Sequence, residues 1–425
     1  MAFEGGQDFL SLLVDRQLVG VHSLVASLVR VFAGTVHYST EGRRTAILTP
    51  GKKGARTERF DQEVASFVRT IPVMLPREIE THVAACGYVG QGKAVRAIAL
   101  GAYRHVSRLR RIWLEGARRE NLPPKTTMLF VGPTGCGKTY LVEILFRDIL
   151  RLPTVVIDMT GFSETGYVGQ DVNSILTRLL YAADMSLAYA AIGIVCLDEF
   201  DKLASGQNSA VFSGAGTTKD VSGLGVQREL LKMLESIEIP VPLEYTHSDY
   251  APKAMMSTQD VGFVACGAFS GLKGMIEQTG TEHIGFGRAP LSGEQERIAV
   301  SYTEEDVMLA RNFMSYGFLP ELIGRFRRIV PFEALTRAQL SLILRSTLLP
   351  QYTNEFLLEG KELVVSDSVL DRIVEESVRK ETGARALEAS FMRYLEDAAF
   401  EAFSEPAARK VSLSVRENEI VHDIS

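Results

Sequence analysis

A glycine-rich octapeptide with phosphate-binding spacing begins at Gly132. It reads GPTGCGKT and matches G-x-x-x-x-G-K-[ST], with an apolar run before it and a helical pattern, Tyr140 to Leu150, after it. Glycines let backbone N–H groups approach phosphate oxygens closely, and a helix N-terminus attracts anions. Lys138 is therefore expected to neutralise the β- and γ-phosphates of a nucleotide, and Thr139 to bind Mg²⁺. The strand and helix on either side disfavour a chance glycine loop.

Two adjacent carboxylates end a second apolar run, Ile194 to Glu199. In open α/β sheets ligands bind at the carboxyl edge of the strands, where this pair would lie. Asp198 is expected to complete the magnesium shell, and Glu199 to orient and polarise an attacking water. Alone the pair is a weak signal, because a solvated strand end looks the same. The expected nucleotide-binding set is Gly132, Pro133, Thr134, Gly135, Cys136, Gly137, Lys138, Thr139, Tyr140 and Asp198.

Short β-type runs alternate with helical runs along the middle of the chain. The expected strands are Thr127–Val131, Val155–Met159, Ile192–Asp198, Val261–Cys266 and Arg328–Pro331. This alternation predicts an α/β fold, in which helices cover both faces of a parallel sheet. After Phe332 only helical periodicity is clear, apart from a β-like stretch at Lys410–Val415. A smaller, mainly helical C-terminal domain is expected there.

The beginning of the chain reads as a separate helical extension. Apolar residues recur at helical spacing over 8–33, which favours a packing helix over a partner-docking or oligomerisation helix. Residues 41–59 are rich in glycine and basic side chains, and are interpreted as a solvated loop rather than a phosphate-binding surface. With a boundary at Pro72–Pro76, the expected domains are 1–75, 76–332 and 333–425.

Composition narrows the class of protein. The 425 residues are 46% apolar and 23% charged, as in soluble globular proteins. The formal net charge of −6 disfavours a machine wrapped around nucleic acid, which needs Lys and Arg to neutralise phosphates. None of the cysteines at 86, 136, 196 and 266 has zinc-ligand spacing, which fits a reducing cytosol. Charged residues interrupt the apolar stretch Phe9–Phe32, so we expect a cytoplasmic protein without a signal peptide or membrane span.

Six further motifs stand in family order along the chain together with the phosphate loop and the carboxylate pair, and with them residues 76–425 resemble the ClpX-type AAA+ unfoldases. The segments are Tyr88-Val89-Gly90-Gln91 (adenine contact), Gly166-Tyr167-Val168-Gly169 (first pore loop), Asp220–Gln227 (second pore loop and its helix), Ile284-Gly285-Phe286 (peptidase docking), Leu319–Arg325 (arginine finger) and Thr382–Arg385 (sensor 2). The resemblance implies a homo-hexamer that uses ATP and Mg²⁺ to unfold proteins and delivers them to a ClpP-like peptidase.

The resemblance also implies roles for single residues. Tyr167, between glycines, would grip translocated polypeptide, unless it is an ordinary exposed turn residue. Arg325 would stabilise charge at a neighbouring subunit's γ-phosphate, which requires a ring; the alternative is a surface salt bridge. Arg385 would contact the phosphates from the small domain, or merely cap a helix.

The last loop motif can be weighed from its composition. Residues 277–290 form a polar, glycine-rich stretch with two large apolar side chains, Ile284 and Phe286. Loops are normally polar, so these side chains either fold back onto the domain or enter a pocket of a partner. The glycines at 285 and 287 favour entry into a partner's pocket, because flexible glycines suit a loop that reaches outward.

One alternative function stays open, and two others are disfavoured by particular features. A stand-alone remodelling chaperone would keep the same motor and lack the peptidase. A nucleic-acid motor of the Holliday-junction type conflicts with the net acidity and with Tyr167. An inactive scaffold conflicts with the complete catalytic set.

The chain departs from the family pattern at four places. Residues 1–75 contain no cysteine, so the N-terminal zinc-binding module is absent. Glu244 and Asp249 lie where relatives carry a basic loop at the pore entrance, which argues against recognition of C-terminal carboxylates. Tyr88 replaces a usual aliphatic residue. The run Ala265-Cys266-Gly267 offers no clear sensor-1 side chain.

Cys136 carries a chemical expectation of its own. It lies at the start of a helix and near Lys138, two features that lower the pKa of a thiol. A reactive thiol whose modification stops ATP hydrolysis is therefore predicted. The alternative is that Cys136 is only a tolerated small residue.

Overall fold

The computed structural model describes residues 53–425 except 163–171, 205–222, 236–237, 244–252, 273–301, 304–306, 308, 381–382 and 418, with side chains from residue 58. Gly54–Ser425 form one compact unit. The helical pattern at 8–33 lies outside the described residues. No described helix is both long enough and apolar enough to cross a membrane.

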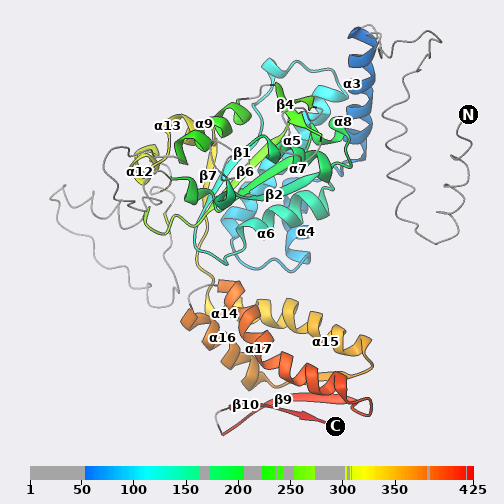
Figure 1. Cartoon of the computed structure of the whole chain (residues 1–425), viewed down its shortest axis with the longest axis vertical. Helices are drawn as coiled ribbons and strands as arrows, with labels where there is room; N and C mark the ends of the chain where they lie inside the picture. Colours follow the sequence, from blue (N-terminus) through cyan, green and yellow to red (C-terminus); the bar gives the residue numbers. More distant parts are fainter. Residues whose placement is uncertain are drawn as a thin grey trace, which may run out of the picture. The chain divides into compact units, whose positions relative to one another are not determined.

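A five-stranded parallel sheet, in the order β2-β3-β6-β1-β7, forms the centre of this unit (Figure 1). Its strands are β1 (Thr127–Val131), β2 (Thr154–Asp158), β3 (Ile194–Asp198), β6 (Gly262–Gly267) and β7 (Arg328–Pro331). All lie within two residues of their predicted bounds, and the predicted α/β fold is confirmed. The phosphate loop after β1 and the carboxylates that end β3 therefore share one edge of the sheet, with β6 between them.

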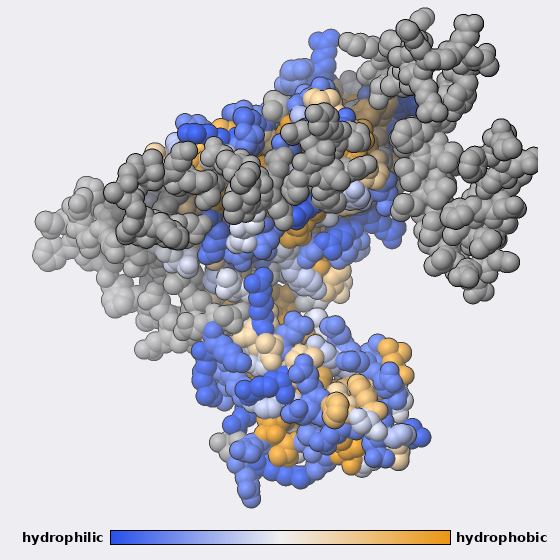
Figure 2. Space-filling view, in the orientation of Figure 1, coloured by the Kyte–Doolittle hydropathy of each residue, from blue (hydrophilic) through white to orange (hydrophobic). Residues whose placement is uncertain are grey.

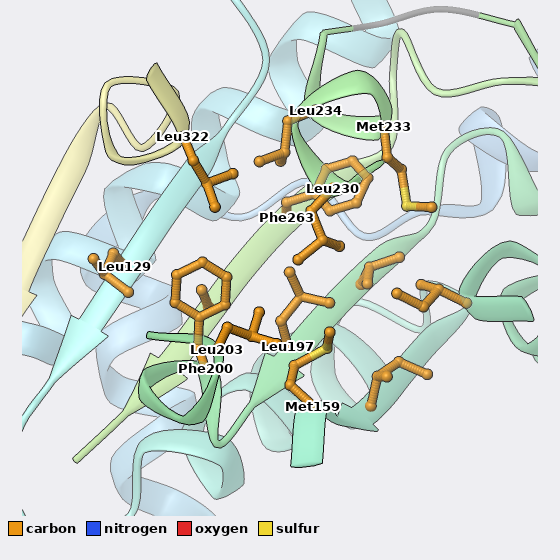
Figure 3. Close-up of a cluster of buried hydrophobic side chains, with 14 of the residues drawn as sticks. Leu129, Met159, Leu197, Phe200, Leu203, Leu230, Met233, Leu234, Phe263 and Leu322 are labelled. Atoms are coloured by element: carbon orange, nitrogen blue, oxygen red, sulfur yellow. The ribbon is translucent and has the colours of Figure 1, made fainter. Parts of the chain in front are cut away.

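Alternate residues of β1 face two separate apolar layers. Leu129 and Val131 belong to one cluster, whereas Met128 and Phe130 belong to the other. The first cluster, part of which is shown in Figure 3, includes side chains of α7 and α9; the second includes side chains of α4 and α5. Burial on both faces explains why these strands read as continuous apolar runs instead of alternating ones.

Helices and short turns connect the strands. The helices are α3 (Lys53–Thr70), α4 (Pro76–Ala85), α5 (Gly92–Trp113), α6 (Lys138–Val142), which continues as a π-helix over Glu143–Ile149, α7 (Ser174–Ala182), α8 (Leu187–Ala190), α9 (Gly223–Leu234), α12 (Ala310–Tyr316) and α13 (Pro320–Ile323). The 3₁₀ turns are η1 (Arg119–Asn121), η3 (Met159–Gly161) and η4 (Phe200–Leu203). An antiparallel pair, β4 (Glu238–Pro242) and β5 (Lys253–Ser257), was not predicted.

The C-terminal part has its own apolar core. Its helices are α14 (Arg337–Ile343), which continues as a π-helix over Leu344–Leu348, α15 (Leu349–Leu358), α16 (Asp367–Lys380) and α17 (Gly383–Ser404). The predicted β-like stretch is β9 (Lys410–Arg416). It lies between β8 (Glu362–Val365) and β10 (Glu419–Ile424) in a three-stranded sheet. The sequence missed β8 and β10 because only four residues of β8 pair and β10 is only half-buried.

Helix α3 corrects the reading of the N-terminal region. The predicted solvated loop at 41–59 is wrong from Lys53, where the helix begins. Its side chains Val64 and Val68 are fully buried in the same cluster as Phe130 of the central sheet. Helix α3 therefore packs with the sheet inside the compact unit that begins at Gly54.

Candidate nucleotide-binding site

The phosphate loop connects the carboxyl end of β1 to the first residue of α6. Gly135 and Gly137 have positive φ angles of 71° and 89°, which favour glycine. At Gly132 an added Cβ would lie 2.5 Å from the carbonyl oxygen of Phe332. The glycines at these positions are therefore required by backbone conformation and by close packing.

The ammonium group of Lys138 lies inside the loop. Its Nζ donates to the carbonyl oxygens of Gly132 and Pro133, both at 2.7 Å, and the residue is only 8% exposed. These carbonyls provide the buried ammonium group with hydrogen-bond acceptors. A phosphate oxygen entering the loop would compete for the same donor.

Thr139 and Asp198 meet across the sheet edge. The hydroxyl of Thr139 donates to Asp198 Oδ2 at 2.9 Å, while Asp198 Oδ1 accepts from the backbone N–H of Glu199 at 3.0 Å. A hydroxyl and a carboxylate are oxygen ligands of the type that Mg²⁺ takes, usually with several waters. The donor set fits a magnesium ion bound with the nucleotide.

Glu199 begins η4 in a left-handed backbone conformation with φ of 51°. Partial burial raises the pKa of its carboxyl group, and the nearby charges of Asp201 and Asp198 raise it further. Lys202 and Arg385 act in the opposite direction on the same pKa. A carboxylate with a raised pKa is better suited to accept a proton from water.

The C-terminal part reaches this site through the start of α17. The backbone N–H of Ala384 donates to the carbonyl oxygen of Gly135 at 3.0 Å. A Cβ on Gly383 would lie 2.6 Å from that oxygen, so a glycine permits the approach. The electrostatic effect of Arg385 on Glu199 shows that this predicted residue also lies near the site.

Tyr88 packs behind the phosphate loop. Its hydroxyl donates to the carbonyl of Gly137 at 3.2 Å, and burial raises its pKa. Gln91, three residues on, exchanges two hydrogen bonds with the backbone of Glu333, of 2.6 and 3.0 Å. Val89 is partly buried between them, and Tyr140 is half-exposed with its ring centroid 6.2 Å from that of Tyr88. The predicted adenine segment thus lies next to the phosphate loop.

The expected low pKa of Cys136 is wrong. Burial raises the pKa of this thiol, and the opposing effect of Lys138 is smaller. The side chain is 3% exposed, with its sulfur 3.8 Å from Lys138 Nζ. Desolvation of a thiolate outweighs the nearby ammonium, which is itself occupied by carbonyl oxygens.

Arg325 lies at the opposite edge of the sheet. Its backbone carbonyl accepts from the hydroxyl of Thr127, the first residue of β1, at 2.7 Å. Its guanidinium donates to the carboxylate of Glu235, just after α9. One strand length, roughly 13 Å, separates this edge from the chain's own phosphate loop.

Asp201 was missed by the sequence reasoning. It is fully buried, accepts from the backbone N–H of Ala268 at 3.0 Å, and pairs with Lys202 at 3.3 Å. It thereby holds the end of β6, where no sensor-1 side chain could be named, against the turn after Glu199. The only signal in the sequence was a third carboxylate two residues after Glu199.

Five predicted functional residues lie outside the described residues: Tyr167, Val168, Ile284, Gly285 and Phe286. The same holds for Asp220–Ser222 of the second pore loop, for Thr382, and for the loop with Glu244 and Asp249.

Comparisons with known proteins agree with this architecture. A family model described as AAA domain (Cdc48 subfamily) matches residues 123–329, and a model of the C-terminal, D2-small domain of ClpB protein matches residues 335–413. The chain is 35% identical to "ATP-dependent Clp protease ATP-binding subunit ClpX" of Azotobacter vinelandii over 85% of this chain and 80% of the relative. It is also 35% identical to "ATP-dependent Clp protease ATP-binding subunit ClpX 3" of Methylococcus capsulatus over 79% of this chain and 78% of that relative. The chain therefore belongs to the ClpX family of nucleotide-binding AAA+ proteins, and it is an ATPase.

Proposed function

We propose that this chain couples ATP hydrolysis to protein unfolding and delivers the unfolded polypeptide to a ClpP-like peptidase in the cytoplasm. The observation that carries the proposal is the arrangement of the charged and hydroxyl side chains. Lys138, Thr139, Asp198 and Glu199 lie at one sheet edge, and Arg325 at the other. Both curated relatives named above are ATP-binding subunits of a Clp protease.

The nucleotide site supports hydrolysis by this chain's own groups. Lys138 exchanges its two carbonyl partners for the β- and γ-phosphates, which places a fixed positive charge beside the bond to be broken. Thr139 and Asp198 would hold Mg²⁺, which when bound would neutralise developing phosphate charge. Glu199 orients the attacking water and accepts its proton, a role that its raised pKa favours.

The position of Arg325 supports a ring of subunits, six in the proposed assembly. An arginine at the far edge of the sheet cannot serve its own phosphate loop, but it can point toward the loop of a neighbouring copy. The C-terminal part also exposes large apolar side chains, and Figure 2 shows hydrophobic residues on its visible face. Leu357, Leu358 and Phe400 are 67%, 79% and 76% exposed. Apolar surface of this kind fits burial against another subunit.

The pore and docking functions rest on the sequence. Tyr167 and Val168 of the first pore loop would grip the polypeptide. Ile284, Gly285 and Phe286 would enter a pocket of the peptidase, and six such loops on a ring would bind multivalently.

The experiment measures degradation of a tagged protein by the cognate peptidase with wild-type and Phe286→Ala chains. We expect Phe286→Ala to keep ATPase and unfolding activity and to lose degradation. Tyr167→Ala is the matched variant, and should slow unfolding while ATP hydrolysis continues. If the wild type unfolds substrate but never activates the peptidase, the alternative of a stand-alone chaperone is correct.

A further inference from the structure

Gln227, in the second turn of α9, is a fully buried amide with three hydrogen bonds to backbone groups. Its Nε2 donates to the carbonyl oxygens of Leu203 at 2.8 Å and Gly317 at 3.1 Å, and its Oε1 accepts from the N–H of Leu319 at 2.8 Å. Both amide hydrogens are therefore used. A satisfied amide in a dry core fixes the relative positions of the segments that it joins.

The three partner residues belong to segments next to the expected catalytic groups. Leu203 ends η4, the turn that starts directly after Glu199. Gly317 caps the C-terminus of α12, and Leu319 is the residue before α13. Arg325 follows α13 by two residues. Gln227 thus connects the turn after Glu199 to the segment that presents Arg325.

A second contact connects the C-terminal end of α9 directly to Arg325. Glu235, the residue after α9, accepts a hydrogen bond from the guanidinium of Arg325. Between the two contacts, Leu230 and Leu234 of α9 pack in one cluster with Leu322 of α13 (Figure 3). Helix α9 and the arginine segment are therefore in contact from the second turn of the helix to its C-terminal end.

We infer that Gln227 is a positioning residue for Arg325. Helix α9 begins at Gly223, directly after the residues assigned by resemblance to the second pore loop. A pull on its N-terminus by bound polypeptide shifts α9, and Gln227 passes that shift to Arg325 and to the turn after Glu199. The inference rests on the proposed function, because it takes Arg325 to act on a neighbour's nucleotide.

Gln227→Met is the direct test, because methionine has a similar size but leaves three backbone groups without partners. We expect unchanged ATP affinity and no stimulation of the ATPase by unfolded protein. The kcat should fall by up to about 10²-fold, because a catalytic group misplaced by about 1 Å can cost that much. Gln227→Glu keeps the acceptor toward Leu319 and serves if the methionine variant fails to fold.

Thr258→Val is the matched control. Thr258 is also fully buried, and its hydroxyl donates to the carbonyl of Met233 on the same helix at 2.9 Å. Its loss should lower the thermal unfolding temperature and leave kcat and substrate stimulation intact. Equal loss of kcat in both variants would mean that Gln227 only stabilises the fold, and would overturn the inference.

Mixed rings locate the defect. Glu199→Gln subunits are expected to hydrolyse almost no ATP, so in mixtures with wild type nearly all activity should belong to wild-type subunits. Adding Gln227→Met to the Glu199→Gln subunits should lower that activity further, as adding Arg325→Ala should. If Arg325→Ala has this effect and Gln227→Met does not, the inference alone fails. If neither has an effect, the arginine does not act between subunits, and both the proposed arrangement and the inference fail.

Discussion

The hydroxyl of Tyr88 donates a hydrogen bond to the carbonyl oxygen of Gly137, 3.2 Å away, and its ring lies against the same glycine. A residue expected to contact adenine therefore also supports the backbone of the phosphate loop. The loop's shape depends on a side chain that lies 49 residues before it in the sequence.

Two substitutions of Tyr88 should separate the contribution of its ring to stability from that of its hydroxyl. Tyr88→Phe removes one hydrogen bond and should cost about 1 kcal/mol, with ATP binding kept. Tyr88→Ala leaves a cavity behind the loop and should cost roughly 3–5 kcal/mol in unfolding free energy. Thermal unfolding with and without nucleotide, beside a fluorescent-nucleotide titration, measures both. A Phe variant as defective as the Ala variant would mean that the hydroxyl, not the ring, supports the loop.

Gly137→Ala should abolish nucleotide binding in a folded protein. The backbone there has φ of 89°, and an added Cβ would lie 3.1 Å from the Tyr88 ring. The left-handed conformation costs a residue with a Cβ roughly 1–2 kcal/mol, which the loop can relieve by changing shape. Gly116→Ala is a suitable control, because that glycine has φ of 70° with no atom within 4 Å of the added Cβ. Equal ATP affinity in both variants would show that the contact with Tyr88 does not matter.

Lys138→Ala and Glu199→Gln should fail at different steps. Lys138→Ala removes the positive charge in the loop, and we expect ATP affinity to fall by about ten- to hundredfold. Glu199→Gln retains binding but loses water activation, and hydrolysis should fall by about 10²- to 10⁴-fold. Nucleotide titration and steady-state phosphate release distinguish them, with Lys410→Ala in the C-terminal sheet as the charge control. The assignments are wrong if both variants lose binding equally.

One thiol per chain should react with maleimide at neutral pH. Cys86 is exposed, whereas Cys136, Cys196 and Cys266 are buried, and burial raises the pKa of Cys136. Mass spectrometry should find the label on Cys86, with ATPase activity retained, and Cys86→Ala should remove the labelling. Labelling of Cys136 that stops ATP hydrolysis, and that bound ATP prevents, would show that Cys136 is a reactive thiol after all.

His105 should make the fold less stable in mild acid. Burial lowers its pKa from 6.5 to about 4; a hydrogen bond to the Ile192 carbonyl and the charge of Asp260 oppose this, while Arg108 and Lys125 add to it. His105 is neutral in the folded protein. Its contribution to the free energy of unfolding is therefore complete above pH 6.5 and is lost as the pH falls toward 4, because the unfolded chain takes up the proton first. The loss amounts to roughly 3 kcal/mol. The apparent unfolding temperatures of wild type and His105→Gln should converge as the pH is lowered from 7 to 4.5. If the two curves of unfolding temperature against pH stay parallel, the prediction is wrong.

The sequence determined the motor's local chemistry. Two features can be recognised without a structure, because each depends on spacing within a short segment. They are the phosphate loop between an apolar strand and a helix, and the carboxylates that end a second strand. The same is true of β1, β3 and β6, the three central strands of the sheet, because burial on both faces leaves a continuous apolar run at each. Family resemblance added Arg325, Arg385 and the loop motifs, whose roles stay predictions.

Only the tertiary structure decided which distant groups meet. Helix α3 joins the sheet's core because Val64 and Val68 find apolar partners there, which a local reading of glycine and basic residues cannot show. Cys136 has a raised pKa because desolvation depends on what surrounds the thiol, not on its neighbours in sequence. The sequence does not distinguish Gln227 from other helix residues, because its partners Leu203, Gly317 and Leu319 meet its amide only in the folded chain. Burial and hydrogen bonds between residues up to 242 positions apart are properties of the folded chain, since packing alone brings such groups within reach.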